Sequence, residues 1–521
     1  MPVQPPSMEQ LQGHASSLGL QLSKEQLLSL REMMLPLLDS FDTIERIPGP
    51  NLLPVKYSRT GGIRPEPNEN VYNAWWQRCD IAPAAGGILE GKSVAIKDTV
   101  CIAGIPMRNG SATLEGYVPD VDASIVTRIL DAGGRIVGKA VCEDLCFSGG
   151  SHTSVTGPVL NPHDVTRSAG GSSSGSGALV AAGVVDLAIG GDQGGSIRLP
   201  SGWCGIVGLK PTYGLVPYTG VFPMDITLDH VGPMAATVRE AALLLDAIAG
   251  PDGLDPRQNA GTVPDRYSEA LADGIAGLRI GVLREGFGWE GLSEPEVDEA
   301  VKAATRKLVE AGAVVHEISI PWHTTARHMW SVIATEGASA LVYRDNATGT
   351  NRKGYYTTGL LESFGQGIRA HANDLSVTNK LSMLLGQYVR EQYRGRYYAL
   401  ARNLCFSLTA AYDQAFSEVD VIAMPTLPMR PTKIPAADAS YEESFARALE
   451  SNANTVAANL TGHPALTVPC QPTGELPIGM MLVGRQSEDA TVLRVGHAFE
   501  ALVGGFAGPK HGPRGPKPSP L

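Results

Sequence analysis

The chain has no surplus of basic residues. Among its 521 residues, 42 lysines and arginines stand against 53 aspartates and glutamates, so the formal net charge at pH 7 is −11. Proteins that hold DNA or RNA through phosphate contacts need a basic surface that displaces counterions. The composition therefore argues against a nucleic-acid partner.

The chain also lacks a long apolar run. The longest apolar stretch, residues 178–191, is too short to cross a bilayer and carries Asp186 in its middle. The first ten residues, MPVQPPSMEQ, have neither the basic start nor the apolar run of a secretory signal. We therefore expect a cytoplasmic protein with no membrane partner.

Cysteine is scarce and irregularly spaced. The seven cysteines are odd in number and stand at positions 79, 101, 142, 146, 204, 405 and 470. A disulfide framework or a structural zinc site needs a more regular pattern, such as C-x-x-C. We expect most of these cysteines to be small core residues, and we expect no bound metal.

Glycine, in contrast, is abundant and clustered. The chain has 60 glycines, and 12 of the 39 residues from Gly170 to Gly208 are glycine. Ordering a glycine-rich segment costs much backbone entropy, so such a segment indicates unusual dihedral angles or very close backbone approach. We expect the functional site here.

Residues 1–85 predict a separate helical region. Ser23 and Gln26 have the spacing of a capping box, and a leucine- and methionine-rich helix follows to about Asp39, with a kink expected at Pro36. Its apolar faces suit either a homodimer contact or a small core of its own. We favour the homodimer.

Residues 86–505 alternate between strand and helix patterns. The predicted strands are 93–96, 135–141, 278–284, 314–320, 419–424 and 478–483, and the predicted helices are 122–131, a helix opened by Pro295, and 489–502. This alternation predicts an α/β fold whose central, mostly parallel mixed sheet is covered by helices. The proline- and glycine-rich tail, residues 506–521, is expected to be disordered.

Three motifs match known signatures but stand in the wrong context. Residues 86–93 read as a P-loop, yet they run into a strand instead of a helix. Residues 286–291 read G-x-G-x-x-G, yet the following helix begins beyond the glycines. Residues 171–175 read G-x-S-x-G, yet a turn-rich loop precedes them, which disfavours Ser173 as a nucleophile. We expect no cofactor.

A lysine and two serine-bearing loops form the remaining candidate site. A serine nucleophile needs a base, and none of the eleven histidines lies in a comparable motif. Lys97 ends the apolar run VAI, where burial favours a neutral lysine that can act as base for Ser172–Ser174 or Ser196. Gly194 and Gly195 suit an oxyanion hole, which favours Ser196 as nucleophile. The residues alone also allow a solvent-facing lysine and flexible connectors.

Five runs of this sequence strongly resemble the amidase signature family: VAIKD, GKAVCEDLCFSG, GGSSSGSGALVAAG, GGDQGGSIRLPSGWCGIVGLKPTYGLVP and NLTGHPALTVP. They cover about residues 86–485 in the family's order. The resemblance implies a Ser-cisSer-Lys triad of Ser196 as nucleophile, Ser172 after a cis peptide bond, and Lys97 as base. It also implies an oxyanion hole formed by the backbone amides of Gln193, Gly194, Gly195 and Ser196.

The resemblance further implies an amidase that hydrolyses small aliphatic or aromatic carboxamides through an acyl-serine. Ser174 and Gln193 depart from the commoner family runs G-G-S-S-G-G and D-T-G-G-S. With its helical N-terminus, the chain is most similar to bacterial amidases associated with nitrile hydratase. There Gln193 is expected near the substrate amide, while Phe147 and Trp330 could line an apolar pocket or belong to the core. Because the lysine base must be neutral, activity is expected to rise toward alkaline pH.

Three other functions stay open at this point. The same triad could hydrolyse carbamates, aryl acylamides or esters. The chain could be an amidotransferase subunit that releases ammonia from glutamine for tRNA-dependent amidation and needs a partner subunit. A catalytically silent binding subunit is disfavoured, because Lys97, Ser172 and Ser196 are all present.

Overall fold

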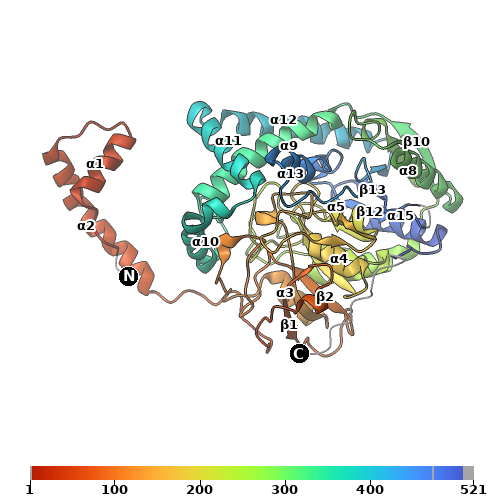
Figure 1. Ribbon diagram of the computed structural model, residues 1–521, viewed down its shortest axis with the longest axis horizontal. Helices are drawn as coiled ribbons and strands as arrows, with labels where there is room; N and C mark the ends of the chain where they lie inside the picture. The colour runs from red at the N-terminus through yellow and green to blue at the C-terminus, as the bar shows by residue number, and fades with distance from the viewer. Residues whose placement is uncertain (1–2, 472–473, 509–521) are drawn as a thin grey trace. The chain divides into compact units, whose positions relative to one another are not determined.

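The computed structural model describes residues 3–471 and 474–508 (Figure 1). The chain divides into two compact units after Pro54. This boundary lies before the predicted one at residue 85, because residues 55–85 belong to the second unit and supply a strand of its sheet. Of the predicted tail, residues 509–521 lie outside the described residues. Within the described residues, no helix is long and apolar enough to span a membrane.

The first unit is a pair of helices, α1 (Met8–Ser17) and α2 (Lys24–Arg46). Both begin with a capping box, and the predicted one at the start of α2 is confirmed by the hydrogen bond from Gln26 N to Ser23 Oγ at 3.2 Å. The helix expected to end near Asp39 continues through Pro36 to Arg46 as one element. Three buried side chains form the core of the pair: Leu11, Ala15 and Leu27.

The second unit is built on a mixed sheet of 11 strands within the described residues, in the order β1-β3-β2-β6-β8-β7-β12-β13-β11-β9-β10. The strands of this sheet are β1 (Trp75–Ile81), β2 (Ser93–Lys97), β3 (Arg135–Ala140), β6 (Leu187–Gly191), β7 (Val207–Lys210), β8 (Val231–Ala235), β9 (Arg279–Leu283), β10 (Val314–Ile318), β11 (Val421–Pro425), β12 (Ala465–Pro469) and β13 (Gly479–Gly484). Strand β2 is parallel to β3 and β6, and β9 is parallel to β10 and β11. The other pairs are antiparallel. A separate small sheet pairs β4 (Leu160–Asn161) with β5 (Asp164–Ser168).

Helices cover both faces of the large sheet. They are α3 (Ser124–Asp131), α4 (Ser174–Ala181), α5 (Arg198–Cys204), α6 (Val238–Ile248), α7 (Tyr267–Ala270), α8 (Pro295–Lys307), α9 (Trp322–Ala338), α10 (Thr358–His371), α11 (Val377–Tyr393), α12 (Arg396–Ala415), α13 (Tyr441–Leu449), α14 (Val456–Thr461) and α15 (Asp489–Leu502). One-turn helices are η1 (Pro67–Glu69), η2 (Ala112–Leu114), η3 (Asp144–Cys146), η4 (Leu271–Asp273), η5 (Arg284–Gly286), η6 (Leu308–Ala311) and η8 (Ala372–Asp374), and η7 (Ser339–Arg344) extends α9. Helices α9, α11 and α12 lie together (Figure 1).

Alternation along β2 directs the predicted base toward one face. Val94 and Ile96 belong to the core that α3, α6 and α15 cover, whereas Ala95 belongs to the core that α4 covers. Successive side chains of a strand point to opposite faces, so Lys97 faces the same side as Ala95. That side carries the serine-rich segment at the start of α4.

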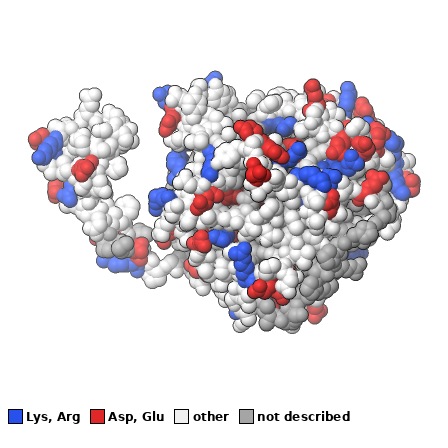
Figure 2. Space-filling view, in the orientation of Figure 1, with Lys and Arg blue, Asp and Glu red and all other residues white. Residues whose placement is uncertain are grey.

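The predicted α/β fold with a mixed sheet covered by helices is confirmed. Strand β2 and helix α15 lie where the sequence predicts them, and residues 86–92 lead into β2 instead of opening a helix. On the face shown in Figure 2, basic and acidic side chains are interspersed over the described surface.

Candidate active site

Lys97 is buried at the end of β2 and contacts the first serine-rich loop. Its side chain is fully enclosed. The Nζ atom donates a hydrogen bond to Ser172 Oγ at 2.8 Å and another to the carbonyl oxygen of Gly191 at 3.3 Å. The structure thus brings together the predicted base and the predicted middle residue of the triad.

Ser172 lies in a tight loop just before α4. The peptide bond between Gly171 and Ser172 is cis, as the resemblance implies. A Cβ atom at residue 171 would lie 2.1 Å from the carbonyl oxygen of Gly150, so only glycine allows this close approach. The neighbouring Ser173 uses its hydroxyl to hold the end of β6, because it donates to Gly191 O and accepts from Gly191 N, both at 3.2 Å.

Ser196 lies in the loop between β6 and α5, next to the serine-rich loop. It is 7% exposed, and its carbonyl oxygen accepts a hydrogen bond from Ser173 N at 3.2 Å. The preceding Gly195 has φ +129°, and a Cβ atom there would lie 2.5 Å from Thr455 Oγ1. Glycine is therefore required at this turn for both its dihedral angle and its size.

The backbone amides before Ser196 divide into two kinds. The N–H of Gly195 donates to Asp192 Oδ1 at 2.8 Å, so it stabilises the loop itself and is not free for an oxyanion. Within the described part of the chain, the N–H groups of Gln193, Gly194 and Ser196 have no protein acceptor. Of the four amides that the resemblance implies for an oxyanion hole, the Gly195 amide is therefore already engaged within the loop.

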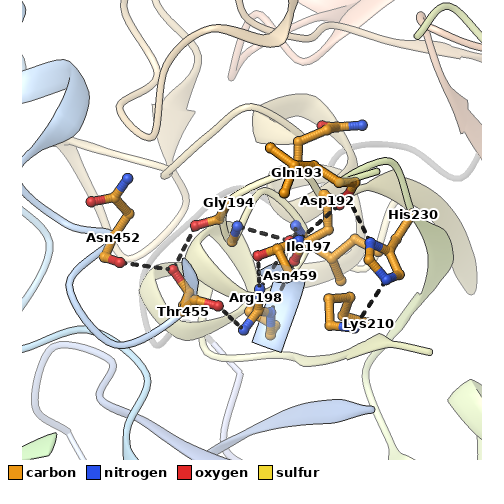
Figure 3. Close-up of polar contacts among 12 residues, drawn as sticks. Asp192, Gln193, Gly194, Ile197, Arg198, Lys210, His230, Asn452, Thr455 and Asn459 are labelled. Atoms are coloured by element: carbon orange, nitrogen blue, oxygen red, sulfur yellow. Dashed lines mark hydrogen bonds and ion pairs between the residues drawn. The ribbon is translucent and has the colours of Figure 1, made fainter. Parts of the chain in front are cut away.

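A buried ion pair supports this loop from below (Figure 3). The Arg198 guanidinium donates to both carboxylate oxygens of Asp192 at 3.0 Å, and Asn459 Nδ2 donates to Asp192 Oδ1 at 2.8 Å. Burial alone raises the pKa of Asp192, but the charge and hydrogen bonds of Arg198 outweigh it and hold the pKa below its usual range. Asp192 is therefore a fixed anion that shapes the loop.

Two further titratable groups, His230 and Lys210, lie beside Asp192 (Figure 3). The carbonyl oxygen of His230 accepts from Asp192 N at 2.8 Å, and its ring Nε2 lies 3.2 Å from Lys210 Nζ. Burial, together with the nearby charge of Arg198, lowers the pKa of Lys210 to about 7. Burial likewise lowers the pKa of His230. Burial therefore disfavours the charged forms of both side chains.

The predicted substrate residues line one pocket together with Ser196. Phe147, Gln193 and Trp330 all contribute to its wall, and Trp330 Nε1 donates to the backbone oxygen of Gln193 at 2.7 Å. Gln193 Nε2 donates to Tyr218 Oη at 2.8 Å, while the buried Gln193 Oε1 has no hydrogen-bond partner among the described residues. Gly194, predicted for the oxyanion hole, also lines the pocket. Sequence reasoning missed the other lining residues, some beside predicted ones and some from distant segments: Cys146, Ser148, Gly149, Leu199, Met224, Ala448, Leu449 and Asn452.

The pocket is mainly apolar, and none of the described residues that line it is an Asp, Glu, Lys or Arg. A ligand with its own charges would lose hydration there without gaining a counter-charge. Elsewhere in the described residues, no three His, Cys, Asp or Glu side chains are grouped to hold a metal ion. The arrangement suits nucleophilic attack on a small neutral carbonyl compound.

Comparisons with known proteins identify the family. The family model described as Amidase matches residues 75–493. The chain is 48% identical over 449 residues to an enantioselective amidase of Rhodococcus rhodochrous, covering 85% of this chain and 86% of that protein. It is 38% identical over 418 residues to the glutamyl-tRNA(Gln) amidotransferase A subunit of Methanosarcina acetivorans, covering 80% of this chain and 85% of that protein.

Two solved structures have a similar fold. The Thermotoga maritima glutamyl-tRNA(Gln) amidotransferase A subunit aligns with a TM-score of 0.69 and 29% identity over 97% of both chains. The native peptide amidase of Stenotrophomonas maltophilia aligns with a TM-score of 0.67 and 28% identity, over 82% of this chain and 85% of that one. Both similarities extend over most of the sheet and its helices.

Proposed function

Because this chain belongs to the amidase family and is an amidase, we propose that it hydrolyses small aliphatic or aromatic carboxamides to a carboxylate and ammonia. The proposed nucleophile is Ser196, with Lys97 as base and Ser172 between them. The proposal rests chiefly on the 2.8 Å contact between Lys97 Nζ and Ser172 Oγ beside the pocket that Ser196 lines.

The proposed reaction is two acyl transfers with one proton relay. Lys97, in its neutral form, accepts a proton from Ser172 as Ser172 accepts one from Ser196, and the Ser196 oxygen attacks the amide carbon. The proton returns by the same route to the leaving nitrogen, which departs as ammonia. Water then repeats the relay and hydrolyses the acyl-enzyme.

Backbone amides stabilise the oxyanion in both steps of this proposal. The free N–H groups of Gln193, Gly194 and Ser196 point to an oxyanion site worth about 3 to 4 kcal/mol per donor in acyl transfer. The pair of Asp192 and Arg198 keeps the loop in this conformation before substrate binds. The loop therefore needs no reorganisation as charge develops.

The pocket supports small neutral amides as substrates. Its apolar wall, with Phe147 and Trp330, suits an aliphatic or aromatic acyl group, and Gln193 Oε1 offers an unpaired acceptor to a carboxamide N–H. Glutamine carries an α-ammonium and an α-carboxylate, for which this wall has no counter-charge. The pocket therefore favours simple amides over glutamine.

A substrate panel tests the proposal. Ammonia release from propionamide, benzamide and glutamine is measured at mildly alkaline pH with the isolated chain and with Ser196→Ala. We expect release from propionamide or benzamide that is lost in Ser196→Ala. Release from glutamine alone would instead support an amidotransferase subunit. Carbamates, aryl acylamides and esters are assayed in parallel, to rank the classes of substrate that the proposed triad hydrolyses.

We also propose that the helix pair forms a homodimer contact. Helix α2 exposes a series of apolar side chains: Leu28, Leu30, Met33, Leu35, Leu37, Phe41 and Ile44. Burying them against a second copy would be favourable, at about 25 cal/mol per Å². We expect Phe41→Glu with Ile44→Glu to halve the molar mass measured by light scattering, while Val263→Glu, at an exposed position of the second unit, keeps the wild-type mass. A monomeric wild type at tens of micromolar would contradict the proposal.

A further inference from the structure

One cysteine pair lies against the catalytic residues and has no place in the proposed mechanism. Cys146 lines the same pocket as Ser196, and its thiol interacts with Lys97 and Ser172. Cys142 lies behind it, and the two thiols interact with each other. No other pair of the seven cysteines combines a mutual contact with a place beside the pocket, within the described residues.

The loop after β3 holds these thiols in a fixed, unusual conformation. Both sulfurs donate to Asn109 Oδ1, Cys142 Sγ at 3.4 Å and Cys146 Sγ at 3.5 Å. Leu145 and Cys146 adopt φ of 46° and 64°, a left-handed backbone that non-glycine residues rarely adopt. Backbone strain of this kind persists where the surrounding structure enforces a side-chain position.

Asn109 supplies a second, independent feature of the site. Its side chain is fully buried, and its Nδ2 has no hydrogen-bond partner within the described residues. A buried amide without an acceptor is costly, and it points to a group that is absent from the resting chain. An oxygen atom added to either neighbouring sulfur would be such an acceptor.

We propose that Cys146 is an oxidation site, at which hydrogen peroxide forms a sulfenic acid that Cys142 then converts to a Cys142–Cys146 disulfide. In the first step the Cys146 thiolate attacks one peroxide oxygen, the S–O bond forms, the O–O bond breaks and hydroxide leaves. In the second step the Cys142 sulfur attacks the Cys146 sulfur, the S–S bond forms, the S–O bond breaks and water leaves with the Cys142 proton. The two sulfurs together lose two electrons to one peroxide.

The electrostatic surroundings favour the thiolate that this chemistry needs. Burial alone raises the pKa of Cys146, but the hydrogen bond with Cys142 and the charge of Lys97 outweigh it and lower the pKa below its usual range. Cys470 is the one cysteine of the seven that is only partly buried. Even so, burial raises the pKa of its thiol, which disfavours the thiolate.

Solvent accessibility predicts that Cys470 is oxidised first, whereas the electrostatic environment predicts Cys146. An oxidation experiment can therefore distinguish the two. The full chain is treated with hydrogen peroxide at pH 7 in the presence of dimedone, which traps sulfenic acids, and the cysteine peptides are quantified by mass spectrometry. We expect Cys146 to be oxidised at least tenfold faster than Cys470, as a disulfide with Cys142 in the wild type and as a dimedone adduct in Cys142→Ser. Preferential oxidation of Cys470, or of no cysteine before the chain unfolds, would overturn the proposal.

Activity is measured in parallel, and this arm rests on the proposed function. Because Cys146 interacts with Lys97 and Ser172, oxidation should abolish amide hydrolysis, and dithiothreitol should restore it. Cys470→Ser should be as sensitive to peroxide as the wild type, whereas Cys146→Ala should keep its own starting activity after treatment. Oxidised Cys146 with undiminished hydrolysis would contradict the role proposed for Lys97 and Ser172 and leave the oxidation site supported.

Discussion

The helix pair of residues 8–46 and the glycine-rich segment of residues 170–208 are organised by opposite means. In the helix pair only Leu11, Ala15 and Leu27 are buried, and each helix is started by its own capping box. In the glycine-rich segment, every residue except Ala181, Gly183 and Asp186 is buried. The first region is specified by neighbours in sequence, and the second by contacts with residues far along the chain.

Glycine shows the difference most directly. A Cβ atom added at Gly13, inside α1, would meet nothing within 4 Å. A Cβ atom added at Gly194 would lie 2.7 Å from the Trp330 ring. The same residue type is therefore a replaceable helix position in one region and a requirement of packing in the other.

The largest expected effect is a loss of activity when one hydroxyl oxygen is removed from the glycine-rich segment. We expect Ser196→Ala to lower kcat for amide hydrolysis by at least about 10⁴-fold, because loss of a nucleophile leaves only binding and the oxyanion site. Ammonia release under saturating amide measures this loss. Ser176→Ala removes a similarly buried hydroxyl that donates only to Ile189 O, at 2.9 Å, and should keep most of the activity. Equal losses in both variants would mean that Ser196 is structural.

The next effect concerns ion pairs in the two regions. Arg198→Met would leave the carboxylate of Asp192 buried without its counter-charge, and we expect a loss of about 3 to 5 kcal/mol in the free energy of unfolding. On α2, Arg31 pairs with the exposed Glu32 at 3.8 Å, so Glu32→Gln, which leaves the hydrogen bond from Arg31 to Pro6 O in place, should cost no more than about 1 kcal/mol. Urea unfolding compares the two. Similar costs would show that the two regions are less different than their burial indicates.

A glycine substitution in each region should change stability in opposite directions. Gly171→Ala places a Cβ atom 2.1 Å from Gly150 O, so we expect a loss of about 1 to 3 kcal/mol together with lower activity. Gly13→Ala should stabilise α1 by about 1 kcal/mol, because alanine loses less backbone entropy in a helix. Thermal unfolding followed by circular dichroism measures both. A stabilising Gly171→Ala would refute the close backbone approach.

The last expected effect is a dependence of stability on pH. Burial raises the pKa of Glu143 to about 7, above the ordinary value of 4.5 that it regains on unfolding. The native chain therefore retains this proton between pH 4.5 and 7 while the unfolded chain releases it, so stability from Glu143 is complete below about pH 4.5 and is lost as the pH rises through 7.

We expect Glu143→Gln to remove this contribution, which is at most about 1.4 kcal/mol per pH unit. Urea unfolding at pH 5, 6 and 7 measures the difference in slope between variant and wild type. Glu25→Gln, on the exposed surface of α2, should retain the wild-type slope. A slope that is unchanged in Glu143→Gln would show that this carboxyl is ionised in the native chain.

Periodic elements were predictable, and buried strands without a clear period were not. Helix α15 and strand β2 were located from their patterns alone. Strands β6 and β8 were missed, because residues 187–191 and 231–235 are buried on both faces and contain glycine or proline in place of an alternating pattern. Strand β1 was assigned to the helical region for a related reason: its place in the sheet depends on pairing with β3, which lies far along the chain.

The sequence by itself determined the chemistry available to this protein: Lys97, the two serine-bearing loops and their glycines are recognisable as residue types in order, and the family follows from them. Only the tertiary structure decided how those groups are used. It engages the Gly195 amide with Asp192, joins Met224 and Leu449 to the pocket, and sets the Cys146 thiol against Lys97. Hydrogen-bond competition and the meeting of distant segments depend on distances in space, which a linear pattern does not contain.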